Sequence, residues 1–126
     1  MMNADIPDCP FCHPADILFE NDMAYSLLDK CPVNPGHLLI IPKRHIADFF
    51  LCTRTEKDAL LSLLDEAKSY LDGEHAPAGY NIGINVGEAA GQTIFHVHLH
   101  LIPRYQGDME NPRGGVRGVI PGKQHY

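Results

Sequence analysis

The chain has 126 residues, of which 44% are hydrophobic and 21% are charged, as is typical of one globular domain. Its formal net charge of −6 argues against nonspecific binding to nucleic acid, and no apolar run approaches the roughly 20 residues of a membrane span. Residues 1–8 are acidic and lack the basic and apolar regions of a signal peptide, which favours a cytoplasmic protein without a membrane or nucleic-acid partner.

The first half of the chain predicts three strands. Two short strands are expected at 17–20 and 23–29, joined by a hairpin turn at 21–22 whose Asn-Asp pair is typical turn chemistry. A loop at 32–36, marked by two prolines and a glycine, leads into a third strand at 37–43. The continuous apolar run of this third strand indicates that it is buried.

One long helix is predicted at 55–72. Its apolar residues recur at helical spacing and form a single stripe: Leu60, Leu63, Leu64, Ala67 and Leu71. Thr55 and Asp58 have the spacing of a capping box, and Gly73 is a plausible stop for the last turn.

The second half predicts two more strands and no second long helix. Residues 80–86 alternate between polar and apolar side chains, as a half-buried strand does, and a small-residue loop at 87–91 precedes a strand at 94–102 that Pro103 ends. Several strands with one long helix, and no regular βαβ alternation, predict an α+β domain with an antiparallel sheet.

The last predicted strand carries the row His96, His98 and His100. Residues two apart on a strand share a face, so three imidazoles are expected to lie together. Histidine is a poor choice for a plain strand face, because each buried ring has two nitrogen atoms to satisfy. Such a row suits either a metal site or a nucleophile that attacks phosphorus through a neutral imidazole.

The residues before this row favour the phosphorus chemistry. Gly91 allows close approach of the backbone, and Gln92 and Thr93 offer side chains that can bind phosphate oxygens. No aspartate or glutamate lies between Ala89 and Gln106, so this stretch supplies no carboxylate ligand for a catalytic metal.

Two segments carry a resemblance to a known family. GQTIFHVHLHLIPR at 91–104 resembles the signature of the histidine-triad (HIT) family of nucleotide hydrolases and transferases, and PGHLLIIPKRH at 35–45 resembles the family's second hallmark. The resemblance covers about 9–105 and implies one HIT domain over 1–126, with a C-terminal tail at 106–126. It implies a five-stranded antiparallel sheet with one long and one short helix, the short one at 48–51, and a homodimer.

The resemblance also implies catalytic roles. His98 would attack the α-phosphorus of a nucleotide to form a nucleotidyl-histidine, which water then hydrolyses. His100 and Gln92 would hold phosphate oxygens and help the leaving group depart, while His37 would orient the nucleophile and His96 completes the triad. The expected substrates are dinucleoside polyphosphates, such as diadenosine tetraphosphate, or nucleoside phosphoramidates, and phosphorolysis in place of hydrolysis stays open.

Further nucleotide contacts follow from the same resemblance. Asp29 would bind the ribose hydroxyls, since a carboxylate can accept two hydrogen bonds from a diol. Asn85, with Gln92, Thr93, His98 and His100, would contact the phosphate. The apolar candidates for a purine slot are Ile17, Phe19 and Leu27.

Four cysteines give a second set of predictions. Cys9 and Cys12 form a CxxC, which serves either redox chemistry or metal binding. The family resemblance implies that Cys9, Cys12, His45 and His96 bind zinc, and a filled Cys2His2 set is typical of a structural site that does not activate water. Cys31 and Cys52 are interpreted as small core residues.

The C-terminal tail and two other functions remain to be weighed. Residues 104–126 carry four basic and two acidic groups, so contact of Arg113 or Arg117 with leaving phosphates competes with a simply solvated or packed tail. One alternative function is a noncatalytic, zinc-stabilised module that binds nucleotides. Another is a metal-dependent hydrolase that uses the triad as ligands.

Overall fold

The computed structural model describes residues 6–126, so residues 1–5 of the segment predicted to lack a signal peptide lie outside the described residues. The strands are β1 (Phe19–Glu20), β2 (Ala24–Leu28), β3 (Leu38–Pro42), β4 (Gly79–Ile84) and β5 (Leu99–Arg104). The one long helix is α1 (Arg54–His75), and the short 3-10 helices are η1 (Phe49–Leu51), η2 (Glu88–Ala90), η3 (Gly115–Val119) and η4 (Pro121–Lys123).

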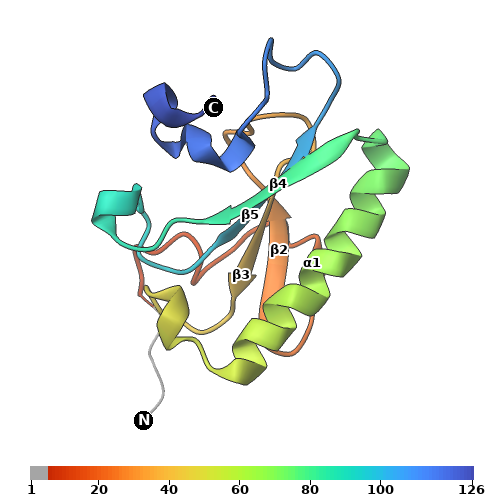
Figure 1. The fold of residues 1–126 in the computed structure, drawn as a ribbon. Helices are drawn as coiled ribbons and strands as arrows, with labels where there is room; N and C mark the ends of the chain where they lie inside the picture. Colours follow the sequence, from red (N-terminus) through yellow and green to blue (C-terminus); the bar gives the residue numbers. More distant parts are fainter. Residues whose placement is uncertain (1–5) are drawn as a thin grey trace.

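The strands form one antiparallel sheet in the order β1-β2-β3-β5-β4, with α1 packed across one face (Figure 1). This confirms the predicted α+β fold, and η1 lies where the short helix was expected. Among residues 6–126, none of the helices has both the length and the apolar character needed to cross a bilayer.

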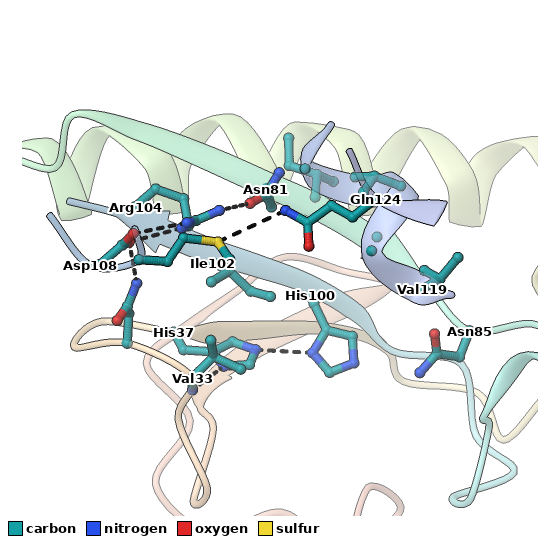
Figure 2. Close-up of a pocket in the computed structure, with 17 residues that line it drawn as sticks. Val33, His37, Asn81, Asn85, His100, Ile102, Arg104, Asp108, Val119 and Gln124 are labelled. Carbon is teal, nitrogen blue, oxygen red and sulfur yellow. Dashed lines mark hydrogen bonds and ion pairs between the residues drawn. The ribbon is translucent and has the colours of Figure 1, made fainter. Parts of the chain in front are cut away.

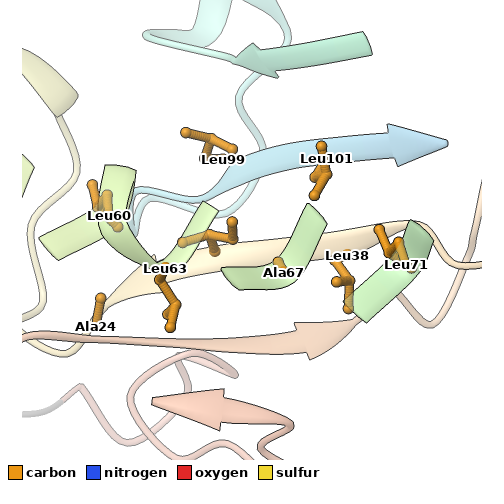
Figure 3. Close-up of a cluster of buried hydrophobic side chains, with 9 residues drawn as sticks. Ala24, Leu38, Leu60, Leu63, Ala67, Leu71, Leu99 and Leu101 are labelled. Atoms are coloured by element: carbon orange, nitrogen blue, oxygen red, sulfur yellow. The ribbon is translucent and has the colours of Figure 1, made fainter. Parts of the chain in front are cut away.

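The helix face of the sheet holds the main core. Leucines of α1 point at the side chains of β2, β3 and β5 (Figure 3), and the buried members are Ala24, Leu38, Ile40, Leu60, Leu63, Ala67, Leu71, Leu99 and Leu101. Each fully buried leucine contributes about 1.5–3 kcal/mol of transfer free energy, so this layer accounts for much of the folding free energy.

The opposite face is covered by two segments, one at residues 9–12 and one near the C-terminus. Phe11 and the neighbouring cysteines pack on Tyr25, Leu39 and Ile41 of β2 and β3. The C-terminal segment with η3 contacts β4, as Figure 1 shows in blue. His100 pairs with Leu39 in the β3–β5 ladder and therefore points to this same face.

Helix α1 differs from its prediction at both ends. Its capping box is Thr53 with Glu56, in place of the predicted Thr55 with Asp58: Thr53 Oγ1 accepts the Glu56 N–H at 3.0 Å, and Glu56 Oε1 accepts the Thr53 N–H at 2.8 Å. The helix also continues through Gly73 to His75. It ends there because Ala76 has a left-handed φ of 45° and precedes Pro77, and a residue before proline avoids the right-handed helical region.

Glu56 is the side chain at this end with the largest expected effect on stability. Its side chain is 1% exposed and accepts hydrogen bonds from Arg44 Nε at 2.8 Å and Nη2 at 2.7 Å. The Arg44 guanidinium holds the pKa of the Glu56 carboxyl below its ordinary value. The stabilisation is therefore present above the ordinary carboxyl pKa of about 4.3 and is lost as the pH falls through the lowered value.

We expect Glu56→Ala to lower the free energy of unfolding at pH 7 by about 3 kcal/mol, because it leaves Arg44 and the Thr53 N–H without their buried acceptor. Urea unfolding measures this loss. The control is Asp72→Asn, which weakens the exposed pair of Asp72 with Lys68 and should cost about 0.5 kcal/mol or less. Equal losses in the two variants would contradict this assignment.

Strand β5 starts and ends later than the strand predicted at 94–102. Its first pair is at Leu99, because the Val97 N–H donates to the Ile46 carbonyl at 2.8 Å and is drawn out of the sheet ladder. The strand continues through Pro103 because the Pro103 carbonyl accepts from Asn34 Nδ2, on the side away from β4. The nitrogen of a strand residue points the same way as its carbonyl, so the missing N–H of the proline removes no bond to β4.

Of the two cysteines that were predicted to lie in the core, one is buried and the other is exposed. Cys52 is 6% exposed and packs with Ile46 and Val97, as predicted. Cys31 is exposed, so its prediction was wrong. It lies in the turn after β2, where its backbone N–H donates to Asp29 Oδ1 at 2.9 Å.

Candidate active site

The three triad histidines approach the same side of the sheet, but only His100 lies within β5. The ring of His98 lies between those of Phe11 and His100, with centroid separations of 5.0 and 5.2 Å. The ring of His96 is 5.9 Å from Phe11 and is fully buried. The predicted shared face is therefore present, although the first two rings stand on the segment that leads into the strand.

The hydrogen bond of His98 identifies which of its ring nitrogens has a free lone pair. His98 Nδ1 lies 2.9 Å from the His96 carbonyl oxygen. A carbonyl only accepts hydrogen bonds, so the proton of the neutral ring is on Nδ1. Nε2 therefore carries a lone pair, which is what an imidazole needs to attack phosphorus.

His37 and His100 form a second pair with a defined direction. The Val33 N–H donates to His37 Nδ1 at 3.0 Å, so the proton of neutral His37 is on Nε2. His37 Nε2 lies 2.9 Å from His100 Nδ1, which must accept that proton's bond (Figure 2). His100 is then left with an N–H at Nε2, a donor suited to a phosphate oxygen or a leaving group.

Burial keeps both rings of this pair neutral. It lowers the pKa of His100 to about 4, an effect reinforced by the imidazoles of His98 and His37 and opposed by the Asp29 carboxylate. Burial also lowers the pKa of His37, and Asp29, whose Oδ2 is 3.5 Å from His37 Nε2, acts in the opposite direction. At neutral pH each ring therefore carries the single proton that the hydrogen bonds assign to it.

A cavity of about 590 Å³ opens beside His100, between β4 and the C-terminal segment (Figure 2). His37, His100 and Asn85 lie on one side and Val119 lies across from them, and the other apolar lining residues include Ile82, Ile102 and Val116. Asn85 lies just beyond the end of β4, so the predicted phosphate ligand is close to His100 by virtue of the β4–β5 pairing. His98 and Asp29 lie outside this cavity lining.

Gln92 is engaged within its own loop. It is 4% exposed, its Oε1 accepts the Gly87 N–H at 2.9 Å, and its Nε2 donates to the Ala47 and Ile94 carbonyls at 2.8 and 3.2 Å. These bonds use both ends of the amide to shape the 87–92 loop. Thr93 follows it with an exposed side chain. Direct contact of Gln92 with phosphate stays a prediction that would require one of these bonds to break.

Two other sequence predictions change in the structure. Phe19 packs against Tyr70 of α1, with ring centroids 5.2 Å apart, so it lies on the helix face and not beside the histidines. Leu27 packs on the histidine face, and Ile17 is exposed. In the tail, the guanidinium groups of Arg113 and Arg117 lie 4.6 and 4.9 Å from the centre of the Tyr126 ring.

The four predicted zinc ligands meet behind the triad. Cys9 Sγ and Cys12 Sγ lie 3.4 and 3.7 Å from His96 Nδ1, and Cys12 Sγ lies 3.2 Å from His45 Nδ1. All four ligand atoms are within 4.8 Å of one another. Zinc bonds of about 2.0–2.3 Å to nitrogen and sulfur give a tetrahedron with edges of roughly 3.3–3.8 Å, so the donor set fits the ion.

The second nitrogen of His96 supports the same assignment. His96 Nε2 donates to the Pro42 carbonyl at 2.7 Å, which leaves Nδ1 for the metal, as outer hydrogen bonds do for metal-bound histidines. The ligands come from three segments that are far apart in sequence. Zinc bound here would join the N-terminal loop and the segment after β3 to the backbone that holds His98.

Sequence analysis missed the role of Val33. Val33 is 66% exposed and borders the cavity, and its backbone N–H donates to His37 Nδ1. A backbone donor leaves no residue-type signature. The Asn34-Pro35-Gly36 turn beside it was the available signal, because such turns place N–H groups in fixed directions.

Comparisons with known proteins agree with this geometry. The HIT domain family model matches residues 12–107. An uncharacterized HIT-like protein of Mycoplasma genitalium is 40% identical over 87 residues, which are 69% of this chain and 62% of the relative. An AP-4-A phosphorylase of Mycobacterium tuberculosis is 31% identical over 73% of this chain and 48% of its own length. An adenylylsulfatase of Arabidopsis thaliana is 36% identical over 80% and 54%, so the chain spans about half of the last two relatives.

A solved structure gives the same result for the fold. The crystal structure of a zinc-bound histidine triad family protein from Mycobacterium smegmatis has a TM-score of 0.73 and 34% identity, covering 82% of this chain and 80% of that one. The family model covers well over half of the sequence, and the sheet, the triad and the Cys2His2 cluster are all in place. The chain therefore belongs to the HIT domain family.

Proposed function

We propose that this protein transfers a nucleotidyl group from a small nucleotide substrate to His98 and then to water. His98 Nε2 forms a bond to the α-phosphorus as the bond from phosphorus to the leaving group breaks. His100 Nε2–H donates a hydrogen bond to the leaving group, which takes up its proton from water as it departs. Water then hydrolyses the nucleotidyl-histidine and releases a nucleoside monophosphate. The observation that carries this proposal is the His98 Nδ1 bond to the His96 carbonyl, which leaves Nε2 unprotonated.

The order of the strands suggests how the substrate lies. Asp29 follows β2, His37 precedes β3, His100 is on β5 and Asn85 follows β4. Because β3 lies between β2 and β5, these side chains run in a line across one face. With the ribose on Asp29 and the α-phosphate at His98 and His100, the leaving group would extend over β4 into the 590 Å³ cavity.

The chemistry of that cavity favours a leaving group without phosphates. Its charged lining residues, Arg104 and Asp108, form an ion pair at 2.8 Å and neutralise each other. Arg113 and Arg117 stack on Tyr126 and are not among the lining residues. We therefore propose that nucleoside phosphoramidates with apolar amines are better substrates than diadenosine tetraphosphate, whose leaving group is a highly charged polyphosphate.

Intact-protein mass spectrometry after a rapid quench at neutral or alkaline pH tests both parts. With an adenosine phosphoramidate we expect an added adenylyl mass that fragmentation locates on His98, and a smaller or slower adduct with diadenosine tetraphosphate. A faster adduct with the tetraphosphate would overturn the leaving-group assignment. No adduct and no product from either donor would support the noncatalytic binding module.

A metal-dependent hydrolase is the second candidate, because Asp29, His37 and His100 also bring three donor atoms within 4.8 Å. The 2.9 Å hydrogen bond between the two rings argues against it, since the atoms that would bind the ion face each other and share a proton. A brief treatment with a chelator that leaves the Cys2His2 zinc in place should not change turnover. Loss of turnover, with zinc still bound, would favour the metal route.

The assembly and location of the protein are part of the same proposal. We propose a homodimer that uses β4, because this is an edge strand whose Ile82 is 48% exposed. We also propose a reducing compartment such as the cytoplasm, which keeps Cys9 and Cys12 as thiols or thiolates for zinc.

A further inference from the structure

We propose that Asn34 is a positioning residue that fixes the protonation and direction of the His37–His100 pair. It holds the 33–36 loop against the end of β5, and that loop supplies the N–H that His37 accepts. The importance of His100 to the reaction rests on the proposed function, but the state of His37 does not.

Asn34 ties the loop to the strand that carries His100. Its Nδ2 donates to the Pro103 carbonyl at 3.0 Å and to Asp108 Oδ2 at 2.8 Å. Its own carbonyl accepts the His37 N–H at 3.1 Å. The side chain thus uses both amide hydrogens to hold a turn that begins at Asn34 and ends at the histidine.

Asp108 is itself held firmly. Arg104 Nε and Nη2 donate to its two oxygens at 2.8 Å each (Figure 2). The Tyr105 N–H donates to Asp108 Oδ2 at 2.9 Å. The side chains of Arg104 and Asp108 are only 22% and 11% exposed. A bidentate pair with little exposure is a rigid anchor, so Asn34 binds to a fixed point and not to a mobile surface group.

Besides Asn34, the Cys31 N–H holds this end of the loop through its bond to Asp29 Oδ1 at 2.9 Å, two residues before Val33. Cys31, Pro32 and Val33 are exposed and contribute no buried side chain. The other end is held by packing: Gly36 has a φ of 89°, and a Cβ there would lie 2.9 Å from Leu71 Cδ2. The Tyr105 hydroxyl adds one bond to the Pro35 carbonyl at 2.6 Å. The placement of the Val33 N–H therefore depends in large part on Asn34.

The Val33 N–H occupies the one nitrogen of His37 that could take up a proton. If the loop loosens, His37 Nδ1 becomes open to protonation by solvent. The groups that face this ring are the Asp29 carboxylate, 3.5 Å away, which favours the cation, and the His100 imidazole. Loss of the Asn34 side chain should thus let His37 titrate at higher pH. The hydrogen bond from His37 Nε2 to His100 Nδ1 should then no longer have one fixed direction.

The test compares Asn34→Ala with Asn21→Ala in the full-length protein. Asn21 is a matched control, because its side chain also anchors a turn, through Nδ2 to the Ala59 carbonyl at 3.0 Å, but on the far side of the sheet. Nitrogen-15 spectra of the imidazoles report the tautomer and titration of His37 without any substrate. We expect His37 to titrate at higher pH only in Asn34→Ala, with kcat lowered roughly tenfold or more and KM within about twofold.

Two variants of Asp108 distinguish loss of the Asn34 contact from a general loss of stability. Asp108→Asn keeps an oxygen that can accept from Asn34 and should retain most of the wild-type titration, whereas Asp108→Ala should reproduce the Asn34→Ala spectrum. An unchanged His37 titration in both Asn34→Ala and Asp108→Ala would overturn the proposal. If the pH at which His37 titrates shifted equally in Asn34→Ala and Asn21→Ala, Asn34 would have only a general structural role. Because the spectra need no nucleotide, neither result depends on the proposed reaction.

Discussion

Replacement of His98 by alanine is expected to lower kcat for nucleotide hydrolysis by at least about 10⁴-fold, because it removes the atom that would form the covalent intermediate. Nucleotide affinity should change little. In the structure the side chain donates a hydrogen bond to the His96 carbonyl and packs at an angle against the rings of Phe11 and His100. The fold should therefore survive its removal.

Steady-state kinetics with isothermal titration of a nucleoside monophosphate measure the two effects separately. His13→Ala is the control, since His13 is an exposed histidine that is not part of the triad. Residual turnover within tenfold of wild type would show that His98 is not the nucleophile. Loss of binding together with turnover would assign the residue to ligand recognition instead.

Removal of one zinc thiolate is expected to have the largest effect on stability. Cys9→Ser should lower bound zinc well below one ion per chain, because the remaining Cys12, His45 and His96 give an incomplete tetrahedron. A zinc ion present at a thousand times its dissociation constant stabilises a fold by about 4 kcal/mol. Losing that stabilisation lowers the Tm of a domain of this size by roughly 10–20 °C.

Metal analysis and calorimetry on matched samples measure both quantities. Cys31→Ser is the control, since Cys31 is exposed and outside the cluster, and it should change neither zinc content nor Tm. Stoichiometric zinc in Cys9→Ser would remove Cys9 from the ligand set. A large loss of zinc without a loss of stability would mean that the ion does not hold the N-terminal loop to the sheet.

The sequence predicted the features that depend on residue type and periodicity. The leucine stripe identified α1, the apolar runs identified the strands, and the two cysteines and two histidines of the cluster are brought together as the resemblance implied. Such patterns predict structure reliably because they depend on which side of a helix or strand is buried, or on which atoms a metal ion binds.

Features that depend on competition between hydrogen bonds could not be predicted in this way. Strand β5 begins its pairing at Leu99 because the Val97 N–H donates to the Ile46 carbonyl. The capping box uses Glu56, whose carboxylate also accepts a hydrogen bond from Arg44. Gln92 has a suitable side chain for phosphate but is bonded to the Ala47 and Ile94 carbonyls. In each case the deciding partner is distant in sequence or is a backbone group.

The division of the sheet into two faces has a consequence for how such a protein can diverge. The leucine-rich layer under α1 stabilises the fold, while the opposite face carries the histidines and is covered by residues 9–12 and by the C-terminal segment. Mutations in the C-terminal segment can therefore change the shape of the cavity beside His100 without disturbing the core that keeps β5 in place. Under the proposed reaction, changes in the terminal segments would alter which leaving group the cavity accepts, while His98 and His100 stay in the same place.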